Sequence, residues 1–248
     1  MYIYIIIQKT LSMKISYISD LHFESNPSFE LINKDNSDVL ILAGDIIIHN
    51  EFDKFKFWFD DINKKWKHII YVKGNHELYG SDISQYTINM ETIDDVHFIN
   101  LTYFPKMTNF EQCMQLTDIC YIDMNGCYST FGSLRNSRSQ LTHVFMKKIN
   151  YVNSHTDWYL SKILNELDKN DKIIITTHFS PDLACMIGYK YPEHQYFHRL
   201  MRQSIIESIQ NKVDYWIYGH THYNRDFEKY GVKFITNQCS TQVKTFEI

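Results

Sequence analysis

Residues 38–46 read DVLILAGDI, an apolar run that ends in a glycine and a carboxylate. Residues 14–22 read KISYISDLH and residues 68–77 read HIIYVKGNHE, so a β-prone run that ends in polar residues occurs three times. Short continuous apolar runs of this kind are typical of strands that are buried on both faces. Residues 51–66 carry aromatic and aliphatic side chains at helical spacing, which predicts a surface helix between two of these strands. Strands and helices that alternate with short connections predict a parallel sheet.

The same alternation continues toward the C-terminus. We expect helices over residues 154–168 and 198–211, strands over 172–177 and 214–218, a hairpin over 226–235 turned at Tyr230-Gly231, and β-prone pieces at 96–101 and 119–124. In open parallel sheets, ligands bind at the carboxyl ends of the strands. The polar residues that follow these strands could therefore share one site.

The composition favours a packed globular protein. The chain has 248 residues, of which 44% are hydrophobic and 15% aromatic, whereas only 8 are glycine and 4 proline, which excludes collagen-like and disordered classes. We find no repeat or linker and expect one domain over residues 14–248, with residues 1–13 as an N-terminal extension or an extra edge strand. The apolar start is too short to span a bilayer and does not resemble a signal peptide, so we expect a cytoplasmic protein without a membrane partner.

Charge and cysteine content exclude further classes. The formal net charge is −4, so no general basic field draws the protein to nucleic acid, and a phosphate-bearing partner must be held by a local feature. Five cysteines without a Cys-x-x-Cys pair argue against a disulfide framework and a zinc ribbon. The even spacing of Cys113, Cys120 and Cys127 has no partner motif, so we do not interpret it as a metal cluster.

Five of the strand-like runs end in residues that can bind metal. Taken alone, each is explained by a turn or by a hydrogen-bonded residue at a strand end, but five in one chain favour a metal site. Carboxylate, amide and imidazole donors without thiolate suit Mn, Fe, Zn, Ni or Co. The candidate ligands are Asp20 and His22, Asp45, Asn75, His178, and His220 with His222.

These motifs, in this order, resemble those of the calcineurin-like metallophosphoesterases, and the resemblance runs from about residue 14 to residue 237. It implies a four-layer α/β/β/α sandwich of two mixed sheets flanked by helices. It also implies two divalent metal ions and a catalytic histidine, His76, near the leaving-group oxygen. In the implied ligand set Asp20, His22 and His222 hold one ion, Asn75, His178 and His220 hold the other, and Asp45 bridges them.

The chemistry agrees with this resemblance. A phosphate ester is anionic, and two divalent ions about 3.5–4 Å apart can clamp the phosphoryl group and generate a metal-bridging hydroxide. We therefore expect a dinuclear phosphoesterase that contains manganese and acts on small phosphodiesters or nucleotides. A histidine can supply the proton that the leaving group needs, and His76 is the candidate. Asn75 and His76, with Tyr189, Tyr191 and His194, are candidate substrate-binding residues, although a solvated loop is the more common explanation for the last three.

Two alternatives remain open from the sequence. A nuclease acting on DNA or RNA would be expected to carry a basic groove, which the composition does not indicate. A non-catalytic protein-interaction scaffold of the same fold usually loses ligands, whereas this chain keeps all seven. The choice between monoester and diester, the physiological substrate and the oligomeric state do not follow from the sequence.

Overall fold

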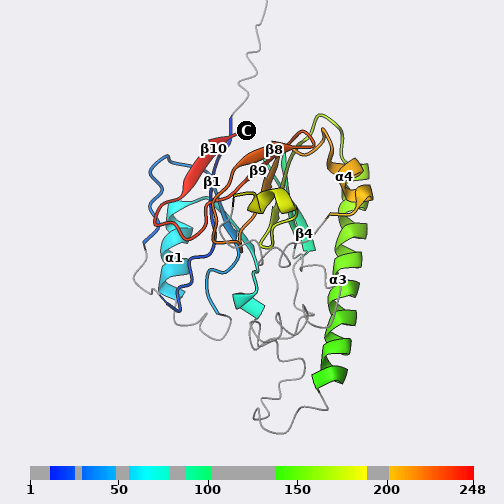
Figure 1. Cartoon of the computed structure of the whole chain (residues 1–248). Helices are drawn as coiled ribbons and strands as arrows, with labels where there is room; N and C mark the ends of the chain where they lie inside the picture. The colour runs from blue at the N-terminus through cyan, green and yellow to red at the C-terminus, as the bar shows by residue number, and fades with distance from the viewer. Residues whose placement is uncertain (1–11, 26–29, 49–55, 79–87, 102–137, 189–200) are drawn as a thin grey trace, which may run out of the picture.

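The computed structural model describes residues 12–25, 30–48, 56–78, 88–101, 138–188 and 201–248 (Figure 1). Its strands are β1 (Lys14–Ile18), β2 (Val39–Ala43), β3 (His68–Val72), β4 (Ile88–Ile93), β5 (Val96–Leu101), β6 (Lys172–Thr177), β7 (Tyr215–Ile217), β8 (Phe227–Lys229), β9 (Val232–Ile235) and β10 (Lys244–Glu247). Its helices are α1 (Lys56–Lys65), α3 (Arg138–Glu166) and α4 (Gln203–Ile209), with 3-10 turns η2 (His76–Leu78) and η4 (Leu183–Met186).

The strands form two mixed sheets. The first has the order β10-β1-β2-β3, in which β1, β2 and β3 are parallel and β10 is antiparallel to β1. The second has the order β4-β5-β6-β7-β9-β8, with a parallel centre from β5 to β9 and an antiparallel strand at each edge. The parallel centres follow from the predicted strand-helix alternation.

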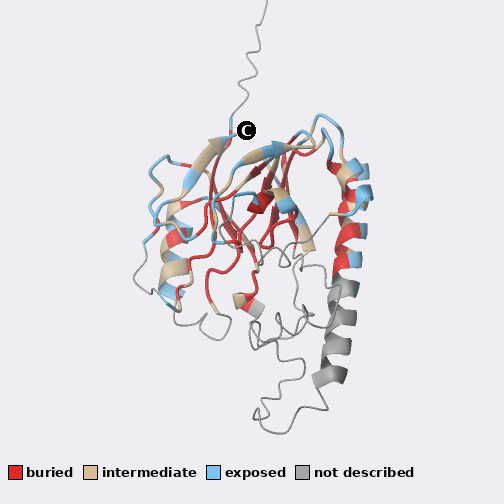
Figure 2. Cartoon of the chain, in the orientation of Figure 1, coloured by how far each residue is buried: buried red, intermediate tan, exposed pale blue. Residues whose placement is uncertain are grey.

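The helices and sheets form four layers in the order α/β/β/α, and an apolar cluster lies between each pair of neighbouring layers. Side chains alternate along β2, so Val39 and Ile41 face the second sheet, where Phe98 and Ile174 meet them, whereas Leu40 faces α1. On the far side of the second sheet, α3 and α4 cover a third apolar cluster. Figures 1 and 2 show α1 on one flank, α3 and α4 on the other, and the buried strands between them. The expected four-layer sandwich of two mixed sheets is confirmed.

Several element boundaries differ from the sequence-based expectations. Strands β4 and β10 were not predicted, and α3 begins at Arg138, whereas we expected a helix only over 154–168. The strand expected at 119–124 and the first residues of the helices expected at 51–66 and 198–211 lie outside the described residues.

Only the last two residues of the N-terminal extension expected over residues 1–13 belong to the described part of the chain. Residues 1–11 lie outside the described part, and both edges of β1 are already occupied, by β2 and β10. Met13 is buried and its backbone pairs with Ile248 in both directions, at 3.2 and 3.1 Å. In the part of the chain that the structure describes, no helix is long and apolar enough to cross a membrane.

Candidate metal centre

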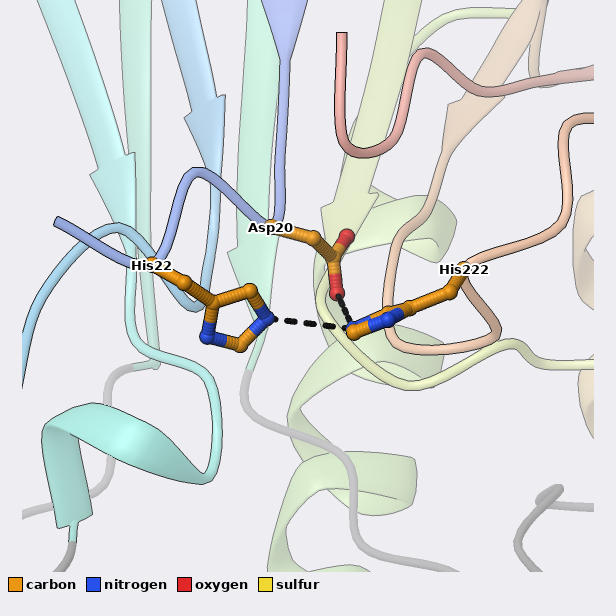
Figure 3. Close-up of side chains that lie close together, drawn as sticks. All are labelled: Asp20, His22 and His222. Carbon is orange, nitrogen blue, oxygen red and sulfur yellow. Dashed lines mark hydrogen bonds and ion pairs between the residues drawn. The ribbon is translucent and has the colours of Figure 1, made fainter. Parts of the chain in front are cut away.

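The first cluster lies where the chain leaves β1 and β7. Nε2 of His222 is 3.1 Å from Nε2 of His22 and 3.3 Å from Oδ1 of Asp20, and Figure 3 shows the three side chains converging. The Asp20 carboxylate is fully buried, whereas half of the His222 side chain is exposed. The cluster therefore has a buried carboxylate at its base and an imidazole that is open to solvent.

The second cluster lies beside the first and is more deeply buried. Nε2 of His178 lies 3.2 Å from Oδ2 of Asp45 and 3.1 Å from Oδ1 of Asn75. The same amide oxygen of Asn75 is 2.9 Å from Nδ1 of His220. The backbone N–H of His220 donates to both carboxylate oxygens of Asp20, at 3.1 and 3.2 Å, so the two clusters adjoin.

Unusual backbone conformations position these side chains. A positive φ occurs at five of the seven predicted ligands, although side chains make this left-handed region unfavourable. Such outliers concentrate at functional sites, because the surrounding structure must hold them in place. The five are Asp20 (φ 56), His22 (φ 47), Asp45 (φ 51), His220 (φ 73) and His222 (φ 49).

A glycine precedes three of the five ligand-bearing turns and leaves room there for a residue of another motif. A Cβ at Gly44 would lie 2.5 Å from the His178 ring, and one at Gly219 would lie 2.7 Å from Oδ2 of Asp20. A Cβ at Gly74 would lie 2.2 Å from Oδ1 of Asp45. The motifs therefore interlock through close approaches that any other residue would obstruct.

Hydrogen bonds from neighbouring groups orient the candidate ligands. Nδ1 of His178 lies 3.0 Å from the carbonyl oxygen of Ala43, and a donor there leaves the lone pair of Nε2 directed into the cluster. The buried Glu77 carboxylate accepts from the backbone N–H groups of Asp45 (3.0 Å) and Gly74 (2.7 Å), and from the Tyr71 hydroxyl (2.7 Å). Glu77 thus joins the turn that carries Asp45 to the turn that carries Asn75.

His76 lies at the edge of both clusters. Its ring packs edge-on against His22 with centroids 4.3 Å apart, and its Nε2 is 3.9 Å from Oδ2 of Asp45. Its backbone N–H donates to Oδ1 of Asp45 at 2.8 Å. Its Nδ1 is 2.7 Å from Oε1 of Glu24.

Protonation in the metal-free state reflects these contacts. Burial lowers the pKa of His178, but Asp45 outweighs burial and raises it to about 9. A hydrogen bond to Asp20 raises the pKa of His222 to about 10. Burial raises the pKa of Asp45, yet His178 holds it well below its usual range. Without metal, protons on the imidazoles therefore balance the buried carboxylates.

The donor set fits divalent metal ions. The candidate ligand atoms of Asp20, His22 and His222 all lie within 4.8 Å of one another, as do those of Asp45, His178 and His220. Each set combines imidazole nitrogen with carboxylate oxygen, the donors that Mn, Fe, Zn, Ni and Co accept. These distances suit an ion about 2.0–2.2 Å from each donor.

An open cavity of about 510 Å³ lies over the first cluster. Its walls include residues that the sequence analysis did not identify, namely Leu21, Ser25, Cys239, Ser240 and Thr241. The segment after residue 237 reaches the site because Ser19 and Gln238 form a parallel bridge and the Gln238 side chain accepts from the His222 backbone at 2.6 Å. No local motif marks this segment.

The structure brings together all seven predicted ligands and His76. The predicted rim residues Tyr189, Tyr191 and His194, and the cysteines Cys113, Cys120 and Cys127, lie outside the described residues. Sequence reasoning missed Glu24 and Gln238 altogether and gave Glu77 no role. The only signal for Glu24 was its position two residues after His22.

Comparisons with known proteins place the chain in a family. A protein of Acanthamoeba polyphaga mimivirus, named uncharacterized protein L509, is 28% identical over 264 residues, which is 90% of this chain and 90% of that protein. The phosphopantetheinyl hydrolase PptH from Mycobacterium tuberculosis has a similar structure, with a TM-score of 0.59 and 16% identity over 92% of this chain and 89% of that one. A dimetal phosphatase from Danio rerio gives a TM-score of 0.52 and 13% identity over 90% of this chain and 86% of that one. At such identities these two structures show a shared fold.

The sequence model of calcineurin-like phosphoesterases matches residues 13–224, most of the chain. Those residues include every one of the seven candidate ligands. The chain therefore belongs to the calcineurin-like phosphoesterase family, and its two clusters of candidate metal ligands support a metal-dependent hydrolase of phosphate esters.

Proposed function

We propose that the protein hydrolyses small phosphodiesters or nucleotides at a dinuclear metal centre. Asp20, His22 and His222 would hold one ion, Asn75, His178 and His220 the other, and Asp45 would bridge them. The observation that carries the proposal is the pair of adjoining clusters, which are linked by the His220 N–H bonds to Asp20 and of which the first opens into the cavity. We also propose manganese as the first metal to test and the cytoplasm as the location.

Two divalent ions bound there would neutralise the phosphoryl oxygens and lower the pKa of a bound water. The chain's own contribution is to hold the donors in fixed positions. Burial of Asp20 and Asp45 and the hydrogen bond from Nδ1 of His178 to the Ala43 carbonyl restrict the ligand side chains before substrate arrives. Little reorganisation is then needed during the reaction.

His76 is suited to the leaving group. Its Nδ1 is engaged by Glu24, whereas its Nε2 faces the space beside Asp45 and the side chain is 23% exposed. An alkoxide leaving group needs a proton or a strong hydrogen bond, and Nε2 of His76 would donate it. An activated nitrophenolate departs without this help.

The described walls of the cavity favour a substrate with one phosphoryl group. They carry hydroxyl, thiol and imidazole groups but no lysine or arginine among the described residues. A second phosphate would therefore find no cationic partner in this part of the chain. This supports a small phosphodiester over a polyphosphate.

The test combines metal analysis with assays. Protein purified without chelators should contain about two ions per chain and should hydrolyse bis-nitrophenyl phosphate faster than nitrophenyl phosphate. Less than about one tightly bound ion, with no activity after Mn or Ni is added, would refute the proposal.

Variants test the role of His76. His76→Ala should slow esters with poor leaving groups by about 10²–10⁴-fold and nitrophenyl esters much less. His68→Ala, at the opposite end of β3, is the matched control and should change neither rate. Equal losses of the His76 variant on both ester types would remove it from the proton-donor role.

A further inference from the structure

Glu24 lies in a tight turn that follows the first motif. The backbone N–H of Ser25 donates to the carbonyl of His22 at 2.8 Å, which closes the turn. Between them Phe23 is fully buried, packs 4.5 Å from the Trp58 ring and donates its N–H to Ile46 at 3.0 Å. Phe23 therefore anchors the turn in the core.

One oxygen of Glu24 contacts two histidines of the site. Oε1 lies 2.7 Å from Nδ1 of His76 and 3.0 Å from Nδ1 of His22. An ionised carboxylate can only accept hydrogen bonds, so both Nδ1 atoms carry hydrogen when these bonds form. The unprotonated Nε2 of His22 then points toward His222, 3.1 Å away, and Nε2 of His76 faces Asp45.

The environment of Glu24 is consistent with a role in the site. The side chain is 13% exposed, and Oε2 is buried with no hydrogen-bond partner in the described residues. Glu77 differs, because its buried carboxylate accepts from the backbone N–H groups of two turns and so stabilises the fold. The partners of Glu24 Oε1 are instead a candidate ligand and the candidate proton donor.

We propose that Glu24 is a positioning residue that orients His22 for metal binding and His76 for the leaving group through one shared oxygen. The His76 half of this proposal rests on the proposed function, and the His22 half requires only that metal binds. A carboxylate bonded to the second nitrogen of a ligating histidine fixes the orientation of the ring and raises its basicity as a ligand. Here one carboxylate would couple the metal site to the proton donor.

Metal affinity gives a readout that needs no substrate. Zn²⁺ is titrated into metal-free protein against a chromophoric chelator, for wild type, Glu24→Gln and a surface control, Glu166→Gln on α3. We expect Glu24→Gln to weaken one of two sites by about 10–100-fold while the other site and the control are unchanged. Unchanged affinity at both sites overturns the proposal.

A competing assignment is tested in the same titration. Ligand atoms of His22, Glu24 and His76 also lie within 4.8 Å of one another, so the three could hold an ion of their own. Three ions per wild-type chain, falling to two in Glu24→Gln, would make Glu24 a ligand and overturn the positioning role.

Kinetics at saturating metal test the His76 half. Glu24→Gln should lower kcat for an alkyl phosphodiester about 10–100-fold more than kcat for bis-nitrophenyl phosphate, with little change in KM. Equal losses for the two substrates overturn this half. The titration measures metal affinity without turnover. A failure of the His22 half can therefore be distinguished from a failure of the proposed hydrolase activity.

Glu24→Asp keeps the negative charge and provides a second test in case Glu24→Gln does not fold. It shortens the side chain by about 1.5 Å, so the carboxylate cannot keep both histidine contacts. We expect Glu24→Asp to lose metal affinity at one site and kcat on the alkyl phosphodiester, each by a smaller factor than Glu24→Gln. Wild-type metal affinity and leaving-group dependence in this variant would show that charge alone suffices, and would overturn the proposal.

Discussion

Replacement of Gly74 by alanine tests whether the interlocking of the motifs is needed for the site. Gly74 is buried and does not have a positive φ, so its backbone conformation accepts alanine without strain. The added Cβ would lie 2.2 Å from Oδ1 and 2.6 Å from the backbone nitrogen of Asp45. Because one of these atoms is backbone, a change of side-chain rotamer cannot relieve the clash.

The size of the effect follows from these distances. Asp45 must retreat by about 1 Å to restore ordinary contact, and a displacement of that size at a catalytic site can cost about 10²-fold in rate. The retreat also disturbs the 2.8 Å bond from the His76 N–H and the 3.2 Å contact with His178. Overpacking of this kind lowers the free energy of unfolding by about 1–3 kcal/mol.

The assay pairs Gly74→Ala with a control that has the opposite properties. Gly188 is exposed, has φ +91 and would place its Cβ 3.0 Å from the flexible end of Tyr223, so Gly188→Ala is strained but its Cβ would contact none of the candidate ligands. We expect Gly74→Ala to lose metal affinity and kcat/KM on bis-nitrophenyl phosphate, and Gly188→Ala to lose only stability. If Gly74→Ala keeps both properties within about threefold of wild type, the interlocking argument is wrong.

Three further predictions concern stability and pH. Glu77→Gln should lower the free energy of unfolding by about 3–5 kcal/mol in urea titrations, because an amide cannot accept from every donor that now faces the buried carboxylate; a loss below about 1 kcal/mol would contradict this. In chelator-treated protein the pKa of His178 is about 9 against an ordinary 6.5, so its proton stabilises the fold fully below about pH 6.5 and this contribution is lost as pH rises through about 9. Urea unfolding between about pH 6 and 10 measures that loss, and metal affinity should rise over the same range as protons leave the ligands. Ending the chain at residue 243 removes β10 and exposes an edge of β1, so the urea midpoint should fall and light scattering should rise; an unchanged midpoint would show that β10 does not stabilise the sheet.

The sequence predicted the strands with buried apolar runs and the hairpin of β8 and β9, but not the edge strands β4 and β10. All five residues of β2 are buried, so its apolar run stands out. In β4 and β10 the side chains are only intermediate or exposed, because each lies at the edge of its sheet. The other two edge strands carry further signals, because β3 keeps an apolar run with two buried residues and β8 lies in a hairpin that turns at a glycine.

The ligands were predictable for a related reason, since each follows a strand. The supporting residues depend on contacts between distant segments and leave no local pattern. Glu24 meets His76 across 52 positions of sequence, and Gln238 supports His222 only because it also forms a bridge with Ser19. Sequence spacing therefore predicted the donors but not what orients them.

The positive φ angles at five of the seven candidate ligands have a consequence for protein engineering. At such positions glycine or asparagine relieves backbone strain of about 1–3 kcal/mol per residue, so a selection for thermal tolerance alone would favour replacing ligands. His222→Gly, for example, would relieve the strain at that position and at the same time remove a candidate metal ligand. Directed evolution of this scaffold would therefore need catalytic screening in every round, because selection for stability alone acts against the candidate ligand positions.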